Sequence, residues 1–474
     1  MKLKFSDSDT IAAIATPMGP GAIGIVKVSG PLSLPIFHKI FKPAKTILEQ
    51  DYPKSHKLYY GWIIDPNGEK IDEVLCTFMK APHSYTTQDI IEIQSHSGPA
   101  VLKAILETVL NHGARLAEPG EFTKRAFLGG RIDLAQAEAV LKLSTAKTEI
   151  QRKSALNLLE GKLSSKLIPI KQELLNALAA IEVAIDFPDE IQEIESEANI
   201  TEKLKNQVIT PIKSLLKRAK NSRIYQEGLR VVICGQPNVG KSSLLNEILN
   251  EERAIVTEIP GTTRDVIYES IIINGIPLTF IDTAGLRDTT DPVEEIGVKR
   301  VQKELNRADI VLWLIDLKKG LTQEDLIIGE KIKELNCIVV LNKKDLIDQK
   351  KIHQLEKNII LSIEKALNLK PIYISISAKT GMGVDQLCEL IIREVLGKNI
   401  EASPPEILLE HRHKNALSSC MTATQNAILH INNGLPELAA IELNQAIDNI
   451  KSITGESSKD ELLETIFSRF CLGK

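Results

Sequence analysis

The spacing of apolar residues changes along the chain and divides it into segments of different character. In the first 120 residues, short apolar runs at 24–28 and 90–93 are bounded by turns rich in Pro and Gly, which predicts strands. Residues 100–112 have the apolar spacing of a helix. The N-terminal segment is therefore expected to be a small α/β unit.

Helical spacing dominates from about residue 121 to residue 222. One apolar face recurs at intervals of four, three and four residues: Leu174, Leu178, Ile181 and Ile185. Pro169 is expected to break or kink this helix, because a proline ring removes one backbone hydrogen bond. The acidic residues 186–197 are interpreted as a solvated connector, after which residues 201–222 resume a helix.

A β-type run at residues 229–234 opens a region in which strands alternate with helices to about residue 397. Such alternation predicts a parallel sheet with helices on both faces. Helical spacing returns after Pro405, and Gly455 is a plausible C-cap of the last long helix. The apolar face of that helix contains Leu443, Ile447 and Ile450.

These changes predict an α/β nucleotide-binding domain inserted into a helical domain whose two halves pack together. The predicted segments are an N-terminal α/β domain at 1–120, the first part of a helical domain at 121–225, the inserted domain at 226–397, and the second part of the helical domain at 398–474.

The composition is that of an ordinary globular protein, with 43% hydrophobic and 25% charged residues in 474 positions. A formal net charge of −4 gives no global basic field, so any nucleic acid would be bound through local patches or a partner. The six cysteines form no CxxC pair, which argues against a zinc site or a disulfide framework. The N-terminus does not resemble a signal peptide, and no apolar run is long enough to cross a bilayer. We expect a cytoplasmic protein.

A glycine-rich turn follows the predicted strand at 229–234. Residues 235–242 are Gly-Gln-Pro-Asn-Val-Gly-Lys-Ser, which is the P-loop pattern in a strand–turn–helix context. Its glycines let backbone N–H groups face a phosphate, Lys241 reaches the β- and γ-phosphate oxygens, and Ser242 offers its hydroxyl to Mg²⁺. The predicted phosphate-binding residues are Asn238, Val239, Gly240, Lys241, Ser242 and Ser243.

Three further motifs follow at strand ends, in the order that a guanine-nucleotide site requires. Asp282-Thr283-Ala284-Gly285 is expected to hold Mg²⁺ through water and to contact the γ-phosphate. In Asn342-Lys343-Lys344-Asp345, the carboxylate of Asp345 can accept hydrogen bonds from guanine N1–H and the 2-amino group, which adenine lacks. Ser377-Ala378-Lys379 supplies a backbone N–H to guanine O6. The four motifs together predict a site for GTP that rejects ATP.

A switch loop is expected between the first two motifs. It contains Gly261-Thr262-Thr263-Arg264-Asp265, in which Thr263 is the predicted second Mg²⁺ ligand. The residue after Gly285 is Leu286, where many small GTPases have a glutamine that orients the attacking water. Leucine can neither donate nor accept a hydrogen bond, so another catalytic group is required. From the sequence alone, Arg264 is one candidate.

With these motifs, the sequence resembles the tRNA-modification GTPases of the MnmE or TrmE family over essentially the whole chain. The segments that are similar to family signatures are 9–17 (DTIAAIATP), 116–128 (LAEPGEFTKRAFL), 261–265 (GTTRD), 282–287 (DTAGLR) and 467–474 (FSRFCLGK). The resemblance implies an N-terminal α/β folate-binding domain, a helical domain and an inserted Ras-like P-loop G domain. It also implies a homodimer formed through the N-terminal domain.

The resemblance further implies a K⁺-activated GTPase that forms a heterotetramer with the FAD-dependent MnmG (GidA) protein. Together they would build an aminomethyl or carboxymethylaminomethyl group at C5 of the wobble uridine of certain tRNAs. A tetrahydrofolate derivative, the 5-formyl or the 5,10-methylene form, would supply the one-carbon unit. The implied cofactors are GTP, Mg²⁺, K⁺ and this folate, and no membrane is implied.

The family pattern assigns K⁺ ligands to Asn238, Thr257, Ile259 and Thr262, on a loop that also contains Glu258, Pro260 and Gly261. A desolvated K⁺ beside the phosphates neutralises charge that develops in the transition state, which is the role otherwise open to Arg264. Glu294 matches the family acid that orients the attacking water. On sequence alone, Glu294 would be read as a solvated acid.

For folate, Glu92 matches the family acid that faces the pterin. Lys27 stands where the family usually has arginine, and Arg131 where a lysine is common, so both keep a positive charge suited to a glutamate-tailed ligand. Cys471 matches the C-terminal family cysteine and is a candidate nucleophile or redox group, with an incidental thiol as the alternative. Lys474 is expected to reach the folate site.

A second function remains open from the sequence: a regulatory or ribosome-assembly GTPase that carries no modification chemistry. P-loop domains with leucine after Asp-Thr-Ala-Gly occur there too. The folate-type N-terminal segment and the tail at 471–474 favour the tRNA-modifying enzyme, because an assembly factor would need neither of them.

Overall fold

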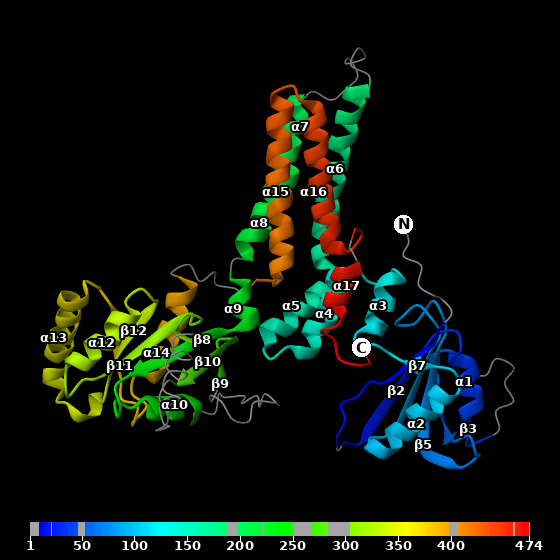
Figure 1. The fold of residues 1–474 in the computed structure, drawn as a ribbon, viewed down its shortest axis with the longest axis horizontal. Coiled ribbons are helices and arrows are strands. Elements are labelled where there is room, and N and C mark those ends of the chain that lie inside the picture. Colours follow the sequence, from blue (N-terminus) through cyan, green and yellow to red (C-terminus); the bar gives the residue numbers. More distant parts are fainter. Residues whose placement is uncertain are drawn as a thin grey trace, which may run out of the picture. The chain divides into compact units, whose positions relative to one another are not determined.

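A computed structural model describes residues 9–19, 21–45, 53–186, 197–219, 221–250, 268–282, 304–397, 405–457 and 460–473, without the side chains of Asn250, Tyr268, Glu269 and Asp282. The chain separates into two compact units (Figure 1). The first contains residues 1–145, 155–216 and 411–474, and the second contains residues 146–154 and 217–410. No helix of the described residues is long and apolar enough to cross a membrane.

The first unit contains a seven-stranded sheet in the order β3-β4-β5-β6-β2-β1-β7, antiparallel except for the parallel pair β1–β7. Its strands are β1 (Ile11–Ile14), β2 (Ile23–Ser29), β3 (Phe41–Pro43), β4 (Leu58–Ile64), β5 (Lys70–Met79), β6 (Ile90–His96) and β7 (Arg115–Leu116). Helices α1 (Ser33–Ile40) and α2 (Pro99–Asn111) pack on one face and form a core with alternate residues of the strands. The predicted strands at 24–28 and 90–93 and the helix at 100–112 are confirmed.

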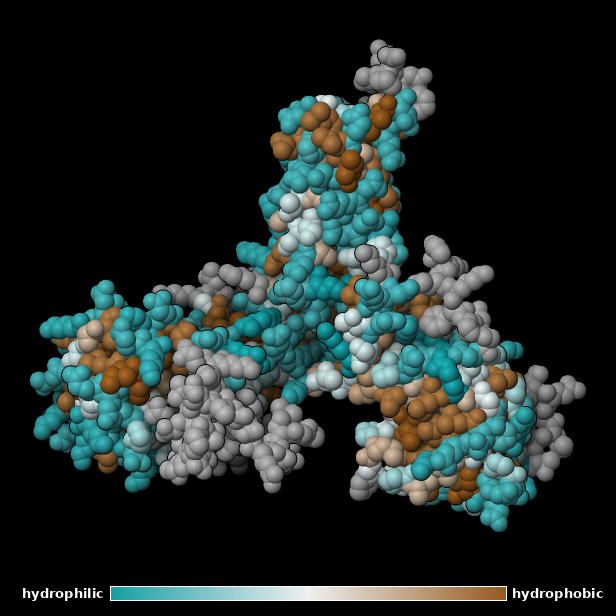
Figure 2. Space-filling model, viewed as in Figure 1, coloured by the Kyte–Doolittle hydropathy of each residue, from teal (hydrophilic) through white to brown (hydrophobic). Residues whose placement is uncertain are grey.

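Successive side chains of a strand point to opposite faces, so every second side chain lies on the face of this sheet that α1 and α2 do not cover. Lys27 of β2 is paired across the sheet with Glu92 of β6, and Glu92 with Thr77 of β5. The next row on the same face contains Leu75 and its partner Tyr60 in β4, and these two side chains are 40% and 49% exposed. Figure 2 shows apolar residues gathered over the strands of this sheet.

The remainder of the first unit is helical. Its elements are α3 (Glu121–Leu128), α4 (Leu134–Thr145), α5 (Glu149–Leu159), α6 (Lys162–Asp186), α7 (Glu197–Lys203), the π-helix η2 (Leu204–Ile209), α8 (Thr210–Arg218), α15 (His411–Asn432), α16 (Pro436–Thr454) and α17 (Asp460–Phe467). Helices α5 and α8 extend partly into the second unit. Helix α16 contacts both α6 and α15, and the three run side by side in Figure 1. Segments far apart in sequence thus share one bundle.

Of the two effects predicted for Pro169, a break is wrong, because α6 is one helix from Lys162 to Asp186. A kink at Pro169 stays a prediction. Leu167 and Ile170, on either side of the proline, are each 1% exposed. Burial of such side chains contributes roughly 1.5–3 kcal/mol each, and several of them along α6 outweigh the loss of one backbone hydrogen bond. Helix propensity is overridden here by tertiary packing.

The other helical predictions have mixed outcomes. Leu174, Leu178 and Ile181 are buried on one face of α6, as predicted, whereas Ile185, the fourth residue of that predicted face, is only partly buried. Gly455 ends α16 in a left-handed conformation with φ of 90°, and its N–H donates to the Lys451 carbonyl at 2.8 Å, so the C-cap is confirmed. The helix predicted at 201–222 is not one helix, since η2 interrupts it and α8 ends at Arg218. The connector was predicted at 186–197, but its end residues Asp186 and Glu197 belong to α6 and α7, and residues 187–196 lie outside the described residues.

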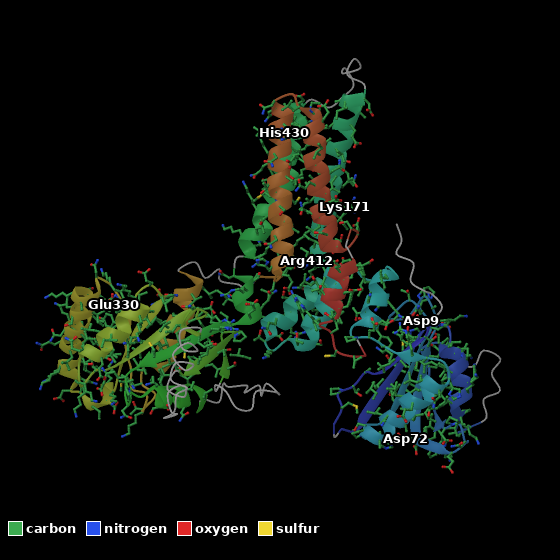
Figure 3. All side chains as sticks on the ribbon, in the orientation of Figure 1. Asp9, Asp72, Lys171, Glu330, Arg412 and His430 are labelled. Carbon is green, nitrogen blue, oxygen red and sulfur yellow. The ribbon has the colours of Figure 1, made fainter. Side chains whose placement is uncertain are left out.

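Three helices of the bundle are joined at one buried polar cluster. Arg412, labelled in Figure 3, donates from Nε to Oε1 of Glu138 in α4 at 3.1 Å and from Nη2 to the Ile453 carbonyl of α16 at 3.4 Å. His413 is fully buried, and its Nε2 lies 2.8 Å from Oε2 of Glu138. Burial acts to raise the pKa of Glu138, but the hydrogen bonds and charges of His413 and Arg412 outweigh it and lower that pKa to about 2. Burial lowers the pKa of His413.

The second unit is a six-stranded sheet in the order β13-β12-β11-β8-β10-β9, parallel except for β9. Its strands are β8 (Leu229–Gly235), β9 (Tyr268–Ile273), β10 (Ile276–Asp282), β11 (Ile310–Asp316), β12 (Cys337–Asn342) and β13 (Ile372–Ser375). Its helices are α9 (Ser222–Glu227), α10 (Lys241–Asn250), α12 (Gln323–Ile332), α13 (Gln349–Leu367), α14 (Val384–Leu396) and the 3₁₀ turn η4 (Lys344–Leu346). Separate cores lie on the two faces, one with α10 and α14 and the other with α12 and α13. The prediction of a mainly parallel sheet covered on both faces is confirmed.

Residues 146–154 are distant in sequence from the rest of the second unit but belong to it. Gln151 donates from Nε2 to the carbonyls of Tyr225 and Gln226, at 2.9 and 3.0 Å. The hydroxyl of Ser154 accepts the Leu408 N–H at 2.7 Å. This piece of the helical region therefore completes hydrogen bonds of the nucleotide-binding unit.

Candidate functional site

The P-loop joins the end of β8 to the start of α10. Gly235 has φ of +149°, and a Cβ there would lie 2.5 Å from the Leu314 carbonyl oxygen of β11. Gly240 has φ of +100°, and a Cβ there would lie 2.3 Å from Nδ2 of Asn342. Only glycine fits at both positions, because each combines a left-handed conformation with a close approach. The loop is thereby held close against β11 and β12.

Lys241 is the first residue of α10 and is 8% exposed. Its Nζ donates to the carbonyls of Gly235 and Gln236 at 3.1 and 2.8 Å, so the ammonium lies across the loop. Ser242 and Ser243 follow in the first turn of the helix, where backbone N–H groups and the helix dipole favour an anion. This arrangement can bind phosphate groups, and the hydroxyl of Ser242 can supply an oxygen ligand to Mg²⁺.

Asn342, which ends β12 and is 2% exposed, connects the predicted motifs. Its Nδ2 donates to the Val239 carbonyl of the P-loop at 2.8 Å. Its Oδ1 accepts the backbone N–H of Ala378 at 2.9 Å. One amide thus fixes the phosphate-binding loop relative to the loop predicted to read the base.

The next residues after β12 strengthen this connection. Lys343 has φ of 68°, and its Nζ donates to the Asn238 carbonyl at 2.9 Å and to Oδ2 of Asp316 at 2.7 Å. Asp345 accepts a hydrogen bond from the Ser377 hydroxyl at 2.6 Å. Lys344 lies between them in η4, and Lys379 follows Ala378 with an exposed side chain. Hydrogen bonds therefore bring three of the four predicted motifs together.

Asp316 belongs to this site and was not identified from the sequence. Burial acts to raise its pKa, but hydrogen bonds from Lys343 and from backbone N–H groups outweigh burial and lower the pKa. The residue thus stays charged and pairs with Lys343. The sequence could have indicated Asp316, because it is the last residue of the central strand β11 and so lies at the same sheet edge as the P-loop.

The remaining predicted nucleotide and K⁺ residues lie outside the described residues. These are Thr257, Glu258, Ile259, Pro260, Gly261, Thr262, Thr263, Thr283, Ala284, Gly285 and Glu294. Arg264 and Leu286 lie outside them too. The backbone of Asp282 ends β10 and is paired with Ile233 of β8, so this position lies at the same sheet edge as the P-loop.

In the first unit, Lys27 and Arg131, two of the residues predicted for folate, lie beside the ring of Tyr85, and Glu92 pairs with Lys27. Nζ of Lys27 lies 3.5 Å from Oε1 of Glu92 and 5.4 Å from the ring centre of Tyr85. The guanidinium of Arg131 lies 4.8 Å from the same ring centre, and its Nη1 donates to the Tyr85 carbonyl at 3.2 Å. The ring of Phe122 is 5.5 Å from Lys27 Nζ. The cluster offers two cations, one carboxylate and two aromatic rings.

Tyr85 and Phe122 were not predicted as site residues. Phe122 lies within the segment 116–128 that carried the resemblance, whereas Tyr85 had no sequence signal that distinguished it from a loop residue. Both have fixed positions: Phe122 is fully buried beside β1, and the Tyr85 hydroxyl hydrogen-bonds the Thr123 hydroxyl at 2.9 Å. Burial raises the pKa of Tyr85, so its hydroxyl stays neutral and able to donate.

A buried ionic network holds α3 beside this cluster. Arg125, which is 3% exposed, donates from Nη2 to Glu121 at 2.8 Å and to Asp9 at 2.9 Å (Asp9 is labelled in Figure 3). Arg115 also donates to Glu121, at 2.6 Å. Burial acts to raise the pKa of Glu121, but hydrogen bonds from Arg115, the Glu118 backbone and Arg125 lower it to about 2. The network positions Phe122 and Thr123, which are the next residues of α3.

The C-terminal tail packs onto the same region. Phe470 is 4% exposed and lies in a cluster with Phe467 and Leu134. Gly473 has φ of 88°, and a Cβ there would lie 2.7 Å from the Ile14 carbonyl oxygen at the end of β1. Cys471 is exposed between these two anchors. The predicted thiol is therefore held near β1, whose Ala13 is paired with Lys27. Lys474 lies outside the described residues.

Comparisons with known proteins match both units. A family model described as "MnmE helical domain" matches residues 134–471, and one described as "GTP-binding protein TrmE N-terminus" matches residues 10–131. A tRNA modification GTPase MnmE of Acetivibrio thermocellus is 44% identical over 472 residues, which is 98% of this chain and 99% of the relative. The chain belongs to the MnmE family. An MnmE protein of Staphylococcus haemolyticus is 42% identical, with 99% of this chain and all of the relative covered.

As an MnmE-family protein, the chain is a tRNA modification GTPase, and its enzymatic activity is GTP hydrolysis. The N-terminal, helical and P-loop parts expected from the sequence are all present. Among solved structures, Aquifex aeolicus Era bound to GDP and AlF4⁻ is 30% identical, with 41% of this chain and 66% of that chain covered at a TM-score of 0.30.

Proposed function

We propose that this chain is a K⁺-activated GTPase that modifies C5 of the wobble uridine of certain tRNAs. It works with the FAD-dependent MnmG (GidA) protein as a heterotetramer and adds an aminomethyl or carboxymethylaminomethyl group, using a tetrahydrofolate one-carbon donor. The observation that carries the proposal is the amide of Asn342, which hydrogen-bonds both the P-loop and the Ala378 loop. A guanine nucleotide spanning these two loops is held by its phosphates and by its base at once.

Each described residue of the nucleotide site has a role in the proposal. Lys241 binds the β- and γ-phosphate oxygens, and Ser242 holds Mg²⁺ together with Thr263. Asp345, held by Ser377, accepts hydrogen bonds from guanine, and the N–H of Ala378 donates to guanine O6. When bound, Mg²⁺ neutralises charge that develops on the phosphates.

The proposal for K⁺ assigns it to Asn238 and to the loop residues Thr257, Ile259 and Thr262. Asn238 is exposed at φ of 61° in the P-loop, and its carbonyl accepts from Lys343. Its backbone is therefore fixed, while its side-chain oxygen is of the type that alkali and other hard cations prefer. Glu294 is proposed to orient the attacking water in place of the missing glutamine.

Folate is proposed to bind at the cluster around Tyr85. The ring of Tyr85 suits a flat pterin, Glu92 accepts hydrogen bonds from its ring N–H groups, and Lys27 and Arg131 attract the carboxylates of the glutamate tail. Cys471 and Lys474 are proposed to act there from the tail. The same proposal assigns folate binding and dimerisation to residues 1–120 and GTP hydrolysis to residues 226–397, within a cytoplasmic protein.

Homodimerisation is proposed through the open face of the N-terminal sheet. Leu58, Tyr60 and Leu75 point to that face from β4 and β5 and are 59%, 49% and 40% exposed. Neighbouring exposed apolar residues on one sheet face are typical of protein interfaces. Light scattering of the full chain should give a dimer, and L75E should give a monomer with unchanged GTP hydrolysis.

The decisive experiment is nucleoside analysis of tRNA from cells that lack this protein, with the wild-type chain returned as a control. Loss of the C5 substituent of the wobble uridine, restored by the wild type, is expected. Normal tRNA nucleosides together with a ribosome-assembly defect would instead support the regulatory GTPase. Binding of 5-formyl-tetrahydrofolate by the purified chain discriminates the two functions more quickly, because only the modifying enzyme needs folate.

A further inference from the structure

The helical part of the first unit contains a cavity that no function above uses. It has a volume of about 330 Å³ and lies between the segment 205–213 and helix α15. Its lining residues are Lys205, Ile209, Thr210, Lys213, Gln425 and Ile428. The volume is at the lower end of the range typical of ligand sites.

An unusual backbone element builds one wall of this cavity. Residues 204–209 form the π-helix η2, which interrupts the run from α7 to α8. The hydroxyl of Thr210 donates to the Lys205 carbonyl at 2.9 Å, which closes the widened turn. Lys205, Ile209 and Lys213 recur at intervals of four and so share a side of the segment. Single π-helical turns cost helix stability and occur frequently at functional sites.

The lining has the chemistry of an anion site. Ile209 and Ile428 are each 7% exposed and form an apolar floor, while the four polar residues are exposed at the rim. Lys205, Lys213 and Gln425 can each donate a hydrogen bond to a ligand, whereas the Thr210 hydroxyl already donates to the Lys205 carbonyl. No carboxylate lines the cavity among the described residues.

The two lysines of the rim differ from others in the bundle. Within the described part of the chain, neither Lys205 nor Lys213 is within ion-pair distance of a carboxylate. Lys171 of α6, labelled in Figure 3, instead lies 2.5 Å from Oε2 of Glu456. Both rim ammonium groups are thus available to an external anion, which is notable in a chain whose net charge is −4.

We propose that this cavity binds phosphate groups of an RNA backbone, namely that of the tRNA in the proposed function, on which this inference rests. The two lysine Cα positions are eight residues apart, which spans about 12 Å along a helix. That span exceeds a single phosphate, so the pair suits successive phosphates of one strand better than a free ion. Gln425 adds a neutral donor to the phosphate or ribose oxygens, as is common where a protein contacts a nucleic-acid backbone.

The test measures binding of a fluorescent, wobble-uridine-containing tRNA to the full chain at several salt concentrations. Each lysine that neutralises a phosphate contributes about 0.7–0.9 to the slope of log K against log salt. The variant K205Q/K213Q should therefore lower that slope by about 1.5 and weaken binding at low salt, while K205R/K213R should bind as the wild type does. The matched control K39Q/K57Q removes two exposed lysines of the N-terminal domain and should leave the slope unchanged.

Acetylation of lysines by a water-soluble reagent gives an independent readout. The tRNA should protect Lys205 and Lys213, whereas millimolar inorganic phosphate should not. Equal protection by phosphate would assign the cavity to a small anion and overturn the inference. A wild-type slope in K205Q/K213Q would overturn it while leaving the proposed function intact. Failure of the wild type to bind or support modification of tRNA would overturn the proposed function and this inference with it.

Discussion

At the scale of the single residue, nucleotide choice depends on the carboxylate of Asp345. Asp345→Asn keeps the size of the side chain and its contact with Ser377 but replaces an acceptor with an amide. We expect GTP affinity to fall about 100-fold, because a hydrogen bond to a charged group contributes roughly 1.5–3 kcal/mol and a guanine donor is left unpaired. Xanthosine triphosphate, whose 2-oxo group accepts, should bind better than GTP. Fluorescent-nucleotide titration measures both, and equal competition by ATP in the wild type would refute the base-reading role.

Asn238 should decide the response to alkali cations. GTP hydrolysis is expected to be about tenfold or more faster in K⁺ than in Na⁺ at equal ionic strength, because Na⁺ is too small for the same set of oxygen ligands and stabilises the transition state less. Asn238→Ala should remove most of that difference with little change in GTP affinity. The measurement is the hydrolysis rate in KCl and in NaCl. Equal wild-type rates in the two salts would exclude K⁺ and return attention to Arg264.

At the scale of the element, the cluster of Glu138, Arg412 and His413 joins α4, α15 and α16. Glu138→Gln leaves the partly buried guanidinium of Arg412 without its anion, which costs about 3 kcal/mol of unfolding free energy. The matched control is Glu456→Gln, which removes the partly exposed pair with Lys171 and should cost less than about 1 kcal/mol. Urea denaturation followed by circular dichroism compares them. Equal effects of the two substitutions would contradict the assigned role of burial.

The same cluster makes the bundle sensitive to acid. The pKa of His413 is lowered in the fold, so the unfolded chain binds a proton first and stability falls as pH drops below about 6.5. The pKa of Glu138 is lowered to about 2, so its contribution is complete above about pH 4.3 and is lost as pH falls toward 2. Glu138→Gln should abolish the lower part of this dependence. Unfolding midpoints measured from pH 7 to pH 3 give the result.

Elements with one dominant signal were predictable from the sequence, and those with competing signals were not. The apolar faces of α6 and α16, the strands β2, β6 and β8 and the P-loop follow from spacing and from glycine geometry. The break predicted at Pro169 is absent, because burial of the neighbouring side chains outweighs the local propensity of proline. The π-helix at 204–209 was missed because nothing in the sequence distinguishes it from an α-helix. Asp316, Tyr85 and Phe122 contact their site residues across distant parts of the sequence, and a local sequence pattern cannot predict such contacts.

At the scale of the whole molecule, the GTP site and the Tyr85 cluster lie in different units, so their activities should separate. Cys471→Ser replaces an ionisable thiol with a hydroxyl that stays protonated near neutral pH. GTP hydrolysis should stay within about twofold of the wild type, while wobble-uridine modification falls about tenfold or more. Rates of phosphate release and of modified-nucleoside formation are compared. Modification at the wild-type rate would remove the thiol from the mechanism.

A truncation after Phe470 extends that test. It removes Gly473, whose backbone packs against the end of β1, but keeps the buried Phe470 that packs with Phe467. If the tail acts only in the folate site, the truncated chain should bind folate more weakly but keep the thermal stability and GTP hydrolysis of the wild type. Loss of both thermal stability and GTPase activity would show instead that the tail stabilises the fold.

Because residues 146–154 belong to the GTPase unit, this unit is not encoded by one continuous stretch of the gene. A recombinant fragment of residues 217–410 leaves the carbonyls of Tyr225 and Gln226 and the N–H of Leu408 without their partners. It also uncovers the core beside Gly275, where Ile150 packs. Such a fragment should melt at a lower temperature than the same unit in the full chain, and a synthetic peptide of residues 146–154 should restore part of the difference. Transfer of this GTPase into another protein would therefore require two gene segments. The shorter segment encodes the start of α5, a helix whose remaining residues belong to the first unit.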